Sequence, residues 1–170
     1  VEINYVMPEG IDREAYEYFK GYPLARPKEL LEKYPTSTYA GWAFPSHGFD
    51  LARLSGKRLI DDLTKSEEER KKDGVSANSE KARKYIEFAE KFIPFNRDHT
   101  NIGIIYMRKA LAHMVLYEWQ KAYESAKKSL EYEWPFWYYR YYPPKRDIQR
   151  KAIKDSIKEM ENRGLVKKGD

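Results

Sequence analysis

Two segments in the second half of the chain carry the same order of small, bulky and helix-breaking residues. Ser79–Asn96 and Gln120–Pro135 superpose with an offset of 40 residues. The aligned pairs are Ala82 with Ala122, Ile86 with Ala126, Ala89 with Ser129, and Pro94 within one residue of Pro135. Spacings of three and four residues place side chains on one face of a helix, and proline stops the helix. The repeat therefore predicts stacked helices, and it limits the fold more than any other feature of the chain.

The same signals predict an all-α fold along the rest of the chain. The segment 102–116 is apolar on several sides, and a short break at 117–118 joins it to the next helix as an αα-hairpin. The predicted helices are 12–20 capped by Asp12, 27–34 with Pro27 first, 51–64 after Asp50, 79–93 capped by Ser79, 102–116, 119–132, and 146–162 ended by Gly164. We expect an irregular, aromatic-rich arm at 1–50, with an ordered loop at 35–49. We also expect a helical domain at 51–170, with a linker at 65–78 and a capping helix at 146–163.

The residues Ala82, Ile86, Ala89 and Pro94 have the types and spacing of the second helix of a tetratricopeptide repeat, and residues 79–135 resemble that family. Other matching positions are Ala110 and His113 in the preceding helix, and Trp119 before the next one. The chain departs from the family pattern in two ways. Its offset is 40 residues, whereas the family's period is about 34, and Ala126 stands where a bulky residue is usual. The resemblance implies antiparallel helical hairpins (TPR-like) and a concave surface that binds other proteins; a generic helical bundle is the alternative.

Composition and charge exclude several classes of function. The chain is 41% hydrophobic and 35% charged, and no run of about 18 apolar residues predicts a transmembrane helix. Net charge is +5, and residues 140–170 alone hold ten basic and five acidic residues. This excess is small for a protein that neutralises many phosphates, so nucleic acid is an unlikely partner. The absence of cysteine excludes disulfides and thiolate metal sites.

No pattern in the sequence predicts catalysis or a bound cofactor. His47, His99 and His113 lie in three separate segments without metal-ligand spacing, and His113 is expected to be a hydrogen-bonded core residue. The carboxylates at 61–62 and 67–69 are typical of solvated helix faces. Phosphate-binding glycine motifs are missing as well. We therefore expect a non-enzymatic protein with no catalytic, cofactor-binding or metal-binding residues.

Aromatic residues occupy eight of the eleven positions from 132 to 142. They could fill the space between the hairpin and the last helix, form a contact surface for a partner, or stack on single-stranded nucleic acid with the help of Arg140, Lys145 and Arg146. The loop at 35–49 adds further rings that need a surface to pack on. The candidate partner-binding residues are Trp42, Phe44, Trp134, Phe136, Trp137, Tyr138, Tyr139, Tyr141 and Tyr142.

These patterns favour a protein-interaction and scaffolding module, an accessory subunit whose partners are other protein subunits. Such a subunit could join a membrane-associated complex through its partners. The alternative is binding of single-stranded nucleic acid or another polyanion through residues 132–168. The chain begins at Val1 rather than Met, which favours a processed, extracytoplasmic protein over a cytoplasmic one. Abundant Lys, Glu and Tyr, few Gln and no Cys resemble the composition of thermophile proteins.

Overall fold

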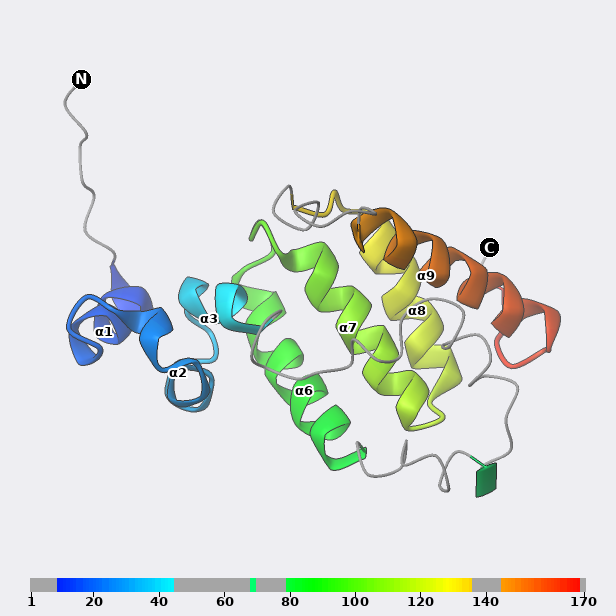
Figure 1. Cartoon of the computed structure of the whole chain (residues 1–170), viewed down its shortest axis with the longest axis horizontal. Coiled ribbons are helices and arrows are strands. Elements are labelled where there is room, and N and C mark those ends of the chain that lie inside the picture. Colours follow the sequence, from blue (N-terminus) through cyan, green and yellow to red (C-terminus); the bar gives the residue numbers. More distant parts are fainter. Residues whose placement is uncertain (1–8, 45–67, 70–78, 136–144, 169–170) are drawn as a thin grey trace.

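The computed structural model describes residues 9–44, 68–69, 79–135 and 145–168, and every regular element in these ranges is helical (Figure 1). The predicted all-α class is confirmed for this part of the chain. The predicted helix 51–64 lies outside the described residues. In chain order the elements are α1 (Gly10–Tyr18), the 3₁₀-helix η1 (Pro23–Ala25), α2 (Pro27–Lys33), α3 (Thr38–Ala43), α6 (Ser79–Phe92), the 3₁₀-helix η5 (Ile93–Phe95), α7 (Ile102–Val115), α8 (Trp119–Leu130) and α9 (Lys145–Asn162).

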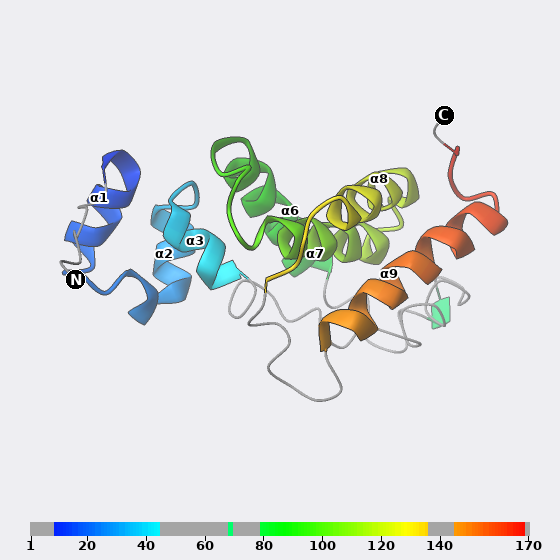
Figure 2. The same cartoon turned by 90° about the horizontal axis from the view of Figure 1, so that it is seen from above.

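Helix α7 forms the centre of the helical domain. All of its residues except Tyr106 and Lys109 are buried, as expected for a helix that is apolar on nearly every side. Helices α6 and α8 pack on α7, and α9 packs on α8 (Figure 2). Ala110 of α7 and Ala122 and Ala126 of α8 are completely buried. Small side chains at these positions let the two helices of the predicted hairpin approach closely.

The helix ends follow the predicted stop signals. Helix α6 ends at Phe92, and Pro94 lies in the 3₁₀-turn that follows it. Gly164, with a φ of +67°, ends α9. The Leu165 N–H donates to the Met160 carbonyl over 3.0 Å, and the Gly164 N–H donates to the Glu161 carbonyl over 3.1 Å. These two bonds define a Schellman motif, which satisfies carbonyls that have no partner within the helix.

The turn between α7 and α8 uses the same motif without glycine. Tyr117 has a φ of +59°, and the Glu118 N–H donates to the His113 carbonyl over 2.9 Å. A tyrosine in this left-handed conformation is uncommon because its Cβ crowds the backbone. The tight hairpin connection therefore carries local strain that the packing of α7 on α8 offsets.

The N-terminal unit, residues 9–44, contains one more α-helix than predicted. The loop expected at 35–49 contains a helix, α3, between Thr38 and Ala43. Ser37 caps it, because the Ser37 hydroxyl accepts a hydrogen bond from the Ala40 N–H over 3.3 Å. The prediction that Asp12 caps its own helix was wrong: α1 begins at Gly10. The Asp12 carboxylate instead accepts bonds from the N–H (2.8 Å) and hydroxyl (2.7 Å) of Thr38, 26 residues away.

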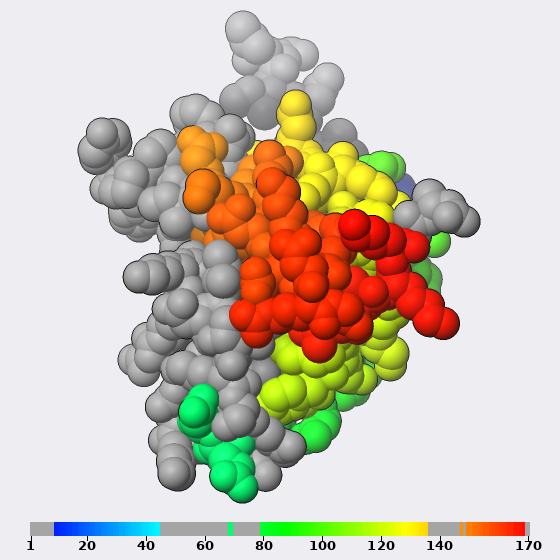
Figure 3. Space-filling model, turned by 90° about the vertical axis from the view of Figure 1, so that its right-hand side faces the viewer, coloured from blue at the N-terminus to red at the C-terminus, as the bar shows by residue number. Residues whose placement is uncertain are grey.

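Helix α9 is anchored to the end of α8 through Arg150. The Arg150 guanidinium donates to the backbone carbonyls of Leu130 (3.4 Å) and Tyr132 (3.2 Å). It also lies 5.1 Å from the ring centroid of Trp134, a cation–π distance. Carbonyls at the C-terminal end of a helix carry partial negative charge, so they attract a cation. Figure 3 shows α9 lying over α8 on this side of the molecule.

None of the described helices combines the length and the apolar character needed to cross a membrane.

Candidate functional site

Most of the large apolar side chains that stay exposed belong to the N-terminal unit. In the part of the chain that the structure describes, five of them belong to this unit: Ile11, Tyr18, Tyr22, Leu24 and Trp42. The other two exposed large apolar side chains are Phe95 of η5, which is 75% exposed, and Tyr117. Tyr22 is 73% exposed, far more than a ring that packs against its own chain. We call the five residues of the N-terminal unit the exposed apolar set.

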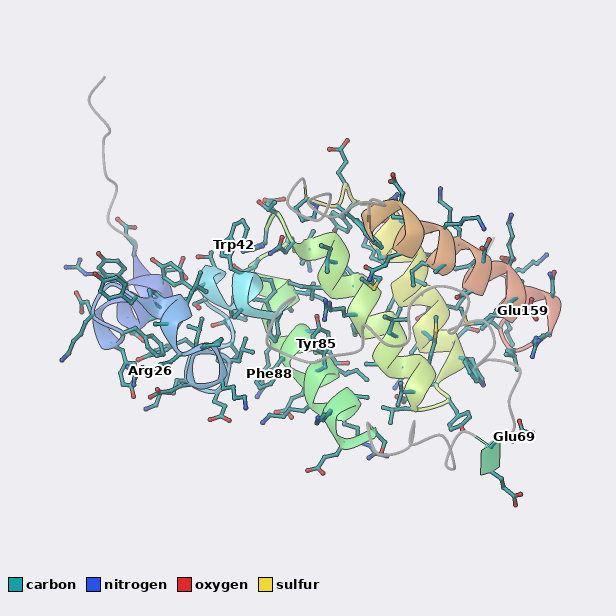
Figure 4. The ribbon with its side chains drawn as sticks, viewed as in Figure 1. Arg26, Trp42, Glu69, Tyr85, Phe88 and Glu159 are labelled. Atoms are coloured by element: carbon teal, nitrogen blue, oxygen red, sulfur yellow. The ribbon has the colours of Figure 1, made fainter. Side chains whose placement is uncertain are left out.

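Trp42 is the one predicted contact residue that the structure describes at the surface. Its ring is 42% exposed, and its other side lies on the ring of His99, with the centroids 5.0 Å apart. Figure 4 shows Trp42 on α3, on the opposite side of the N-terminal unit from Arg26. A half-exposed tryptophan fixed by a neighbouring ring is well suited to contact a partner.

Phe44, also predicted as a contact residue, is completely buried. Its ring centroid lies 5.6 Å from those of Tyr85 and Phe88 and 5.7 Å from that of Phe92. These three rings come from α6, and Figure 4 shows Phe88 on the side of α6 that faces the N-terminal unit. In this structure, Phe44 therefore joins the N-terminal unit to the helical domain and is not available to a partner.

Trp134 is likewise part of the core, with 3% exposure. Its indole N–H donates to the Ser129 carbonyl over 3.1 Å. A Cβ added to Gly103 of α7 would come within 2.8 Å of the Trp134 ring. Together with the Arg150 contact, this places the ring between the hairpin and α9, as the core interpretation of the aromatic segment predicts. Phe136, Trp137, Tyr138, Tyr139, Tyr141 and Tyr142 lie outside the described residues.

A polar junction fixes the N-terminal unit on the helical domain. Three side chains of the loop between η5 and α7 contact three backbone carbonyls next to or within α3. The contacts are Asn96 Nδ2 to Thr36 O (2.7 Å), His99 Nε2 to Thr38 O (2.9 Å) and Asn101 Nδ2 to Gly41 O (2.9 Å). Carbonyls taken out of water need such partners.

Sequence reasoning did not identify this junction, because Asn and His in a loop are also ordinary turn formers. The position of Asn96 and Asn101 in the sequence could have indicated the junction. Asn96 and Asn101 are buried polar residues, and they flank a loop that runs directly into the most apolar helix of the chain. Polar side chains at such a place must find partners inside the protein.

A polar cleft of about 390 Å³ lies where α6 meets the α7–α8 turn. Its described lining consists of Arg83, Ile86, Glu90, His113, Leu116, Glu118 and Lys121. His113 is 3% exposed, and its Nδ1 lies 3.2 Å from Glu118 Oε1. The prediction of a hydrogen-bonded core histidine is confirmed.

The two groups of this pair titrate in ways that keep the histidine neutral and the carboxylate charged. Burial lowers the pKa of His113 below its usual value, although the hydrogen bond and charge of Glu118 raise it. Burial raises the pKa of Glu118, but its hydrogen bonds to His113 and Lys121 and the charge of Lys121 lower it. A neutral imidazole could act as a base, yet the described lining offers no Ser, Thr or Cys nucleophile beside it. Among the described residues, no group of His, Asp and Glu side chains could hold a metal ion.

Comparisons with known proteins give no further identification. No family model, no curated protein sequence and no solved structure matches the chain.

Proposed function

We propose that this chain is a non-enzymatic protein-binding module, an accessory or scaffolding subunit of a larger assembly. The observation that carries this proposal is the exposed apolar set. Apart from this set, Phe95 and Tyr117, the large apolar side chains of the described part of the chain are buried or half-buried. Five such side chains on one small unit offer apolar contact area on more than one of its sides, and exposed apolar side chains of this kind are typical of contact surfaces.

The way the N-terminal unit is held supports the same function. Its position is fixed by the buried ring of Phe44 and by the three polar contacts to its carbonyls. A surface that is already rigid loses less conformational entropy when a partner binds. The exposed apolar set is therefore presented in a preorganised arrangement.

The TPR-like interpretation of the helical domain belongs to this proposal. Ala82 and Ala89 of α6 are completely buried, and so are their aligned partners Ala122 and Ser129 of α8. The resemblance requires small residues at these positions, where neighbouring helices touch. A generic helical bundle would bury the same residues, so the support is for close helix packing at the expected positions. Under this proposal, the helical domain is a platform and the N-terminal unit provides much of the contact.

The alternative of a nucleic-acid binder is less well supported. Of the residues it would use, Trp134 is buried and Arg150 is occupied by carbonyls of its own chain. Neither is free to stack on a base or to bind a phosphate.

The test is affinity purification from the native source with two matched variants of the full chain. The first, Tyr22→Ser with Leu24→Ser, removes two exposed apolar residues of the set. The second, Glu124→Ser with Lys127→Ser, changes two exposed residues of α8. We expect a co-purifying protein, quantified by mass spectrometry, to be lost with the first pair and kept with the second. The proposal is refuted when no protein is retained above background, or when both variants retain the same proteins equally.

A further inference from the structure

His99 is the central contact of the polar junction, and its two ring nitrogens have different partners. Nε2 lies 2.9 Å from the Thr38 carbonyl oxygen. A carbonyl can only accept, so Nε2 must carry a proton and donate it. On the other side of the ring, the Asn101 backbone N–H donates to Nδ1 over 3.0 Å. Nδ1 must therefore be unprotonated, and the junction specifies the neutral Nε2–H tautomer.

A second proton on this ring would oppose both the hydrogen bonding and the local field. Protonated Nδ1 would point its N–H at the N–H of Asn101, and the hydrogen bond there would be lost. Asn101 is the N-cap residue of α7. The N-terminus of a helix carries partial positive charge, so an imidazolium is disfavoured next to it.

The ring is half-buried between two elements. Its centroid lies 5.4 Å from that of Phe92 and 5.0 Å from that of Trp42. A Cβ added to Gly41 of α3 would come within 2.6 Å of the His99 ring. The imidazole is therefore covered by α3 on one side and α6 on another. A charged ring in this place would lose part of its hydration.

Among the described residues, the charged groups around the ring come from α1, from its own loop and from the segment after α8. Glu133 of that segment lines a cleft of about 410 Å³ together with His99. Asp12 of α1 acts on His99 through its negative charge. Arg97 and Asp98 precede His99 in the loop. The neighbours from α3 and α6 are the uncharged rings of Trp42 and Phe92, and α7 contributes the Asn101 N–H. Burial lowers the pKa of His99, although the Thr38 hydrogen bond and Asp12 raise it.

We propose that His99 is a proton-sensitive latch, which holds the N-terminal unit on the helical domain while its imidazole is neutral and weakens when the imidazole is protonated. The undocked state takes up a proton more readily than the docked state. The latch is therefore at full strength above the ordinary histidine pKa of about 6.5 and weakens as the pH falls below it. In this window the docking equilibrium constant falls by at most about tenfold per pH unit. The latch does not depend on the proposed function.

The test follows docking by single-molecule fluorescence transfer in the full chain. Because the chain contains no cysteine, the substitutions Glu14→Cys on α1 and Glu124→Cys on α8 provide two unique dye positions. Both residues are exposed. At pH 7.5 we expect one dominant, narrow transfer population. Between pH 6.5 and pH 5.0 a second, broader population should grow by up to about tenfold per pH unit.

Two matched variants assign this response to a single residue. His99→Gln keeps a side-chain N–H for the Thr38 carbonyl but gains no proton in this range, so we expect it to abolish the pH response. His113→Gln removes the other histidine of the described residues and should leave the response intact. The latch is overturned when the parent shows no second population down to pH 5.0. It is also overturned when His99→Gln responds like the parent, or when His113→Gln alone removes the response.

A direct measurement on the unsubstituted chain covers the case in which His99→Gln does not fold. With three histidines in the chain, the ring nitrogens of each can be assigned by ¹⁵N nuclear magnetic resonance. The latch requires the Nε2–H tautomer at His99 and titration below the ordinary histidine pKa. An Nδ1–H tautomer, or titration at or above that value, contradicts it.

Discussion

Replacing Phe44 by alanine tests whether this ring belongs to the core or to a contact surface. The side chain is completely buried against three aromatic rings of α6. Phe→Ala at such a site costs about 3–5 kcal/mol, from lost burial and from the cavity that remains. For a chain of 150–250 residues, 1 kcal/mol shifts Tm by about 2–4 °C, so we expect Tm to fall by about 6–20 °C.

The matched control is Trp42→Ala, two residues earlier, in the helix α3 that Phe44 caps at its C-terminal end. The Trp42 ring is 42% exposed, so its removal takes less apolar area out of the protein, and the cost should be roughly 1–2 kcal/mol. Urea unfolding followed by far-ultraviolet circular dichroism measures both values. Hydrogen exchange shows whether the loss is confined to the N-terminal unit or spreads to α7. A cost for Phe44→Ala below about 1 kcal/mol, or below that of Trp42→Ala, would refute the core assignment.

Three further predictions concern helix ends, pH and the last helix. Lys20 follows α1 with a φ of +53°, so Lys20→Gly should stabilise the protein by about 0.5–1 kcal/mol, whereas Gly164→Ala should destabilise it by about 1 kcal/mol. Thermal unfolding measures both changes. A loss of stability for the first or a gain for the second contradicts the argument from backbone conformation. The unfolding free energy should fall as the pH drops from 7 to 5, because the lowered pKa values of His99 and His113 mean that the unfolded chain binds more protons. The slope is at most about 1.4 kcal/mol per pH unit for each group, and urea titrations at each pH that show no change would contradict it. Arg150→Ala should cost about 1–3 kcal/mol, because it leaves carbonyls at the end of α8 without their charged donor. Hydrogen exchange should then speed up in α9 and not in α7, and equal acceleration in both helices would contradict the anchoring role.

The predictions that succeeded depend on residues close together in the chain. Pro27 begins α2, Pro94 follows the end of α6, and Gly164 closes α9. Each is a local effect of backbone geometry, so it can be identified without knowing what packs nearby. The burial of α7 was also visible in the sequence, because a helix that is apolar on nearly every side has no face to offer to water.

The features that the sequence did not reveal depend on partners distant in the chain. Asp12 was assigned as the cap of its own helix, but its carboxylate accepts hydrogen bonds from Thr38, the first residue of α3. The polar junction requires the loop after η5 to meet carbonyls about sixty residues earlier. An aromatic ring suits a core and an interface equally well. The helices that lie beside Phe44 and Trp134 therefore decide which role each ring has.

The sequence by itself determined that the described chain is helical, where most of its described helices begin and end, and that the segment of α7 is apolar on several sides. These properties follow from spacings of three and four residues and from the backbone preferences of proline and glycine. Only the tertiary structure decided which aromatic rings are buried, which remain exposed on the N-terminal unit, and that His99 joins the two parts. Such choices depend on which surfaces meet in space. A local pattern of residue types does not say which distant segments of the chain will meet.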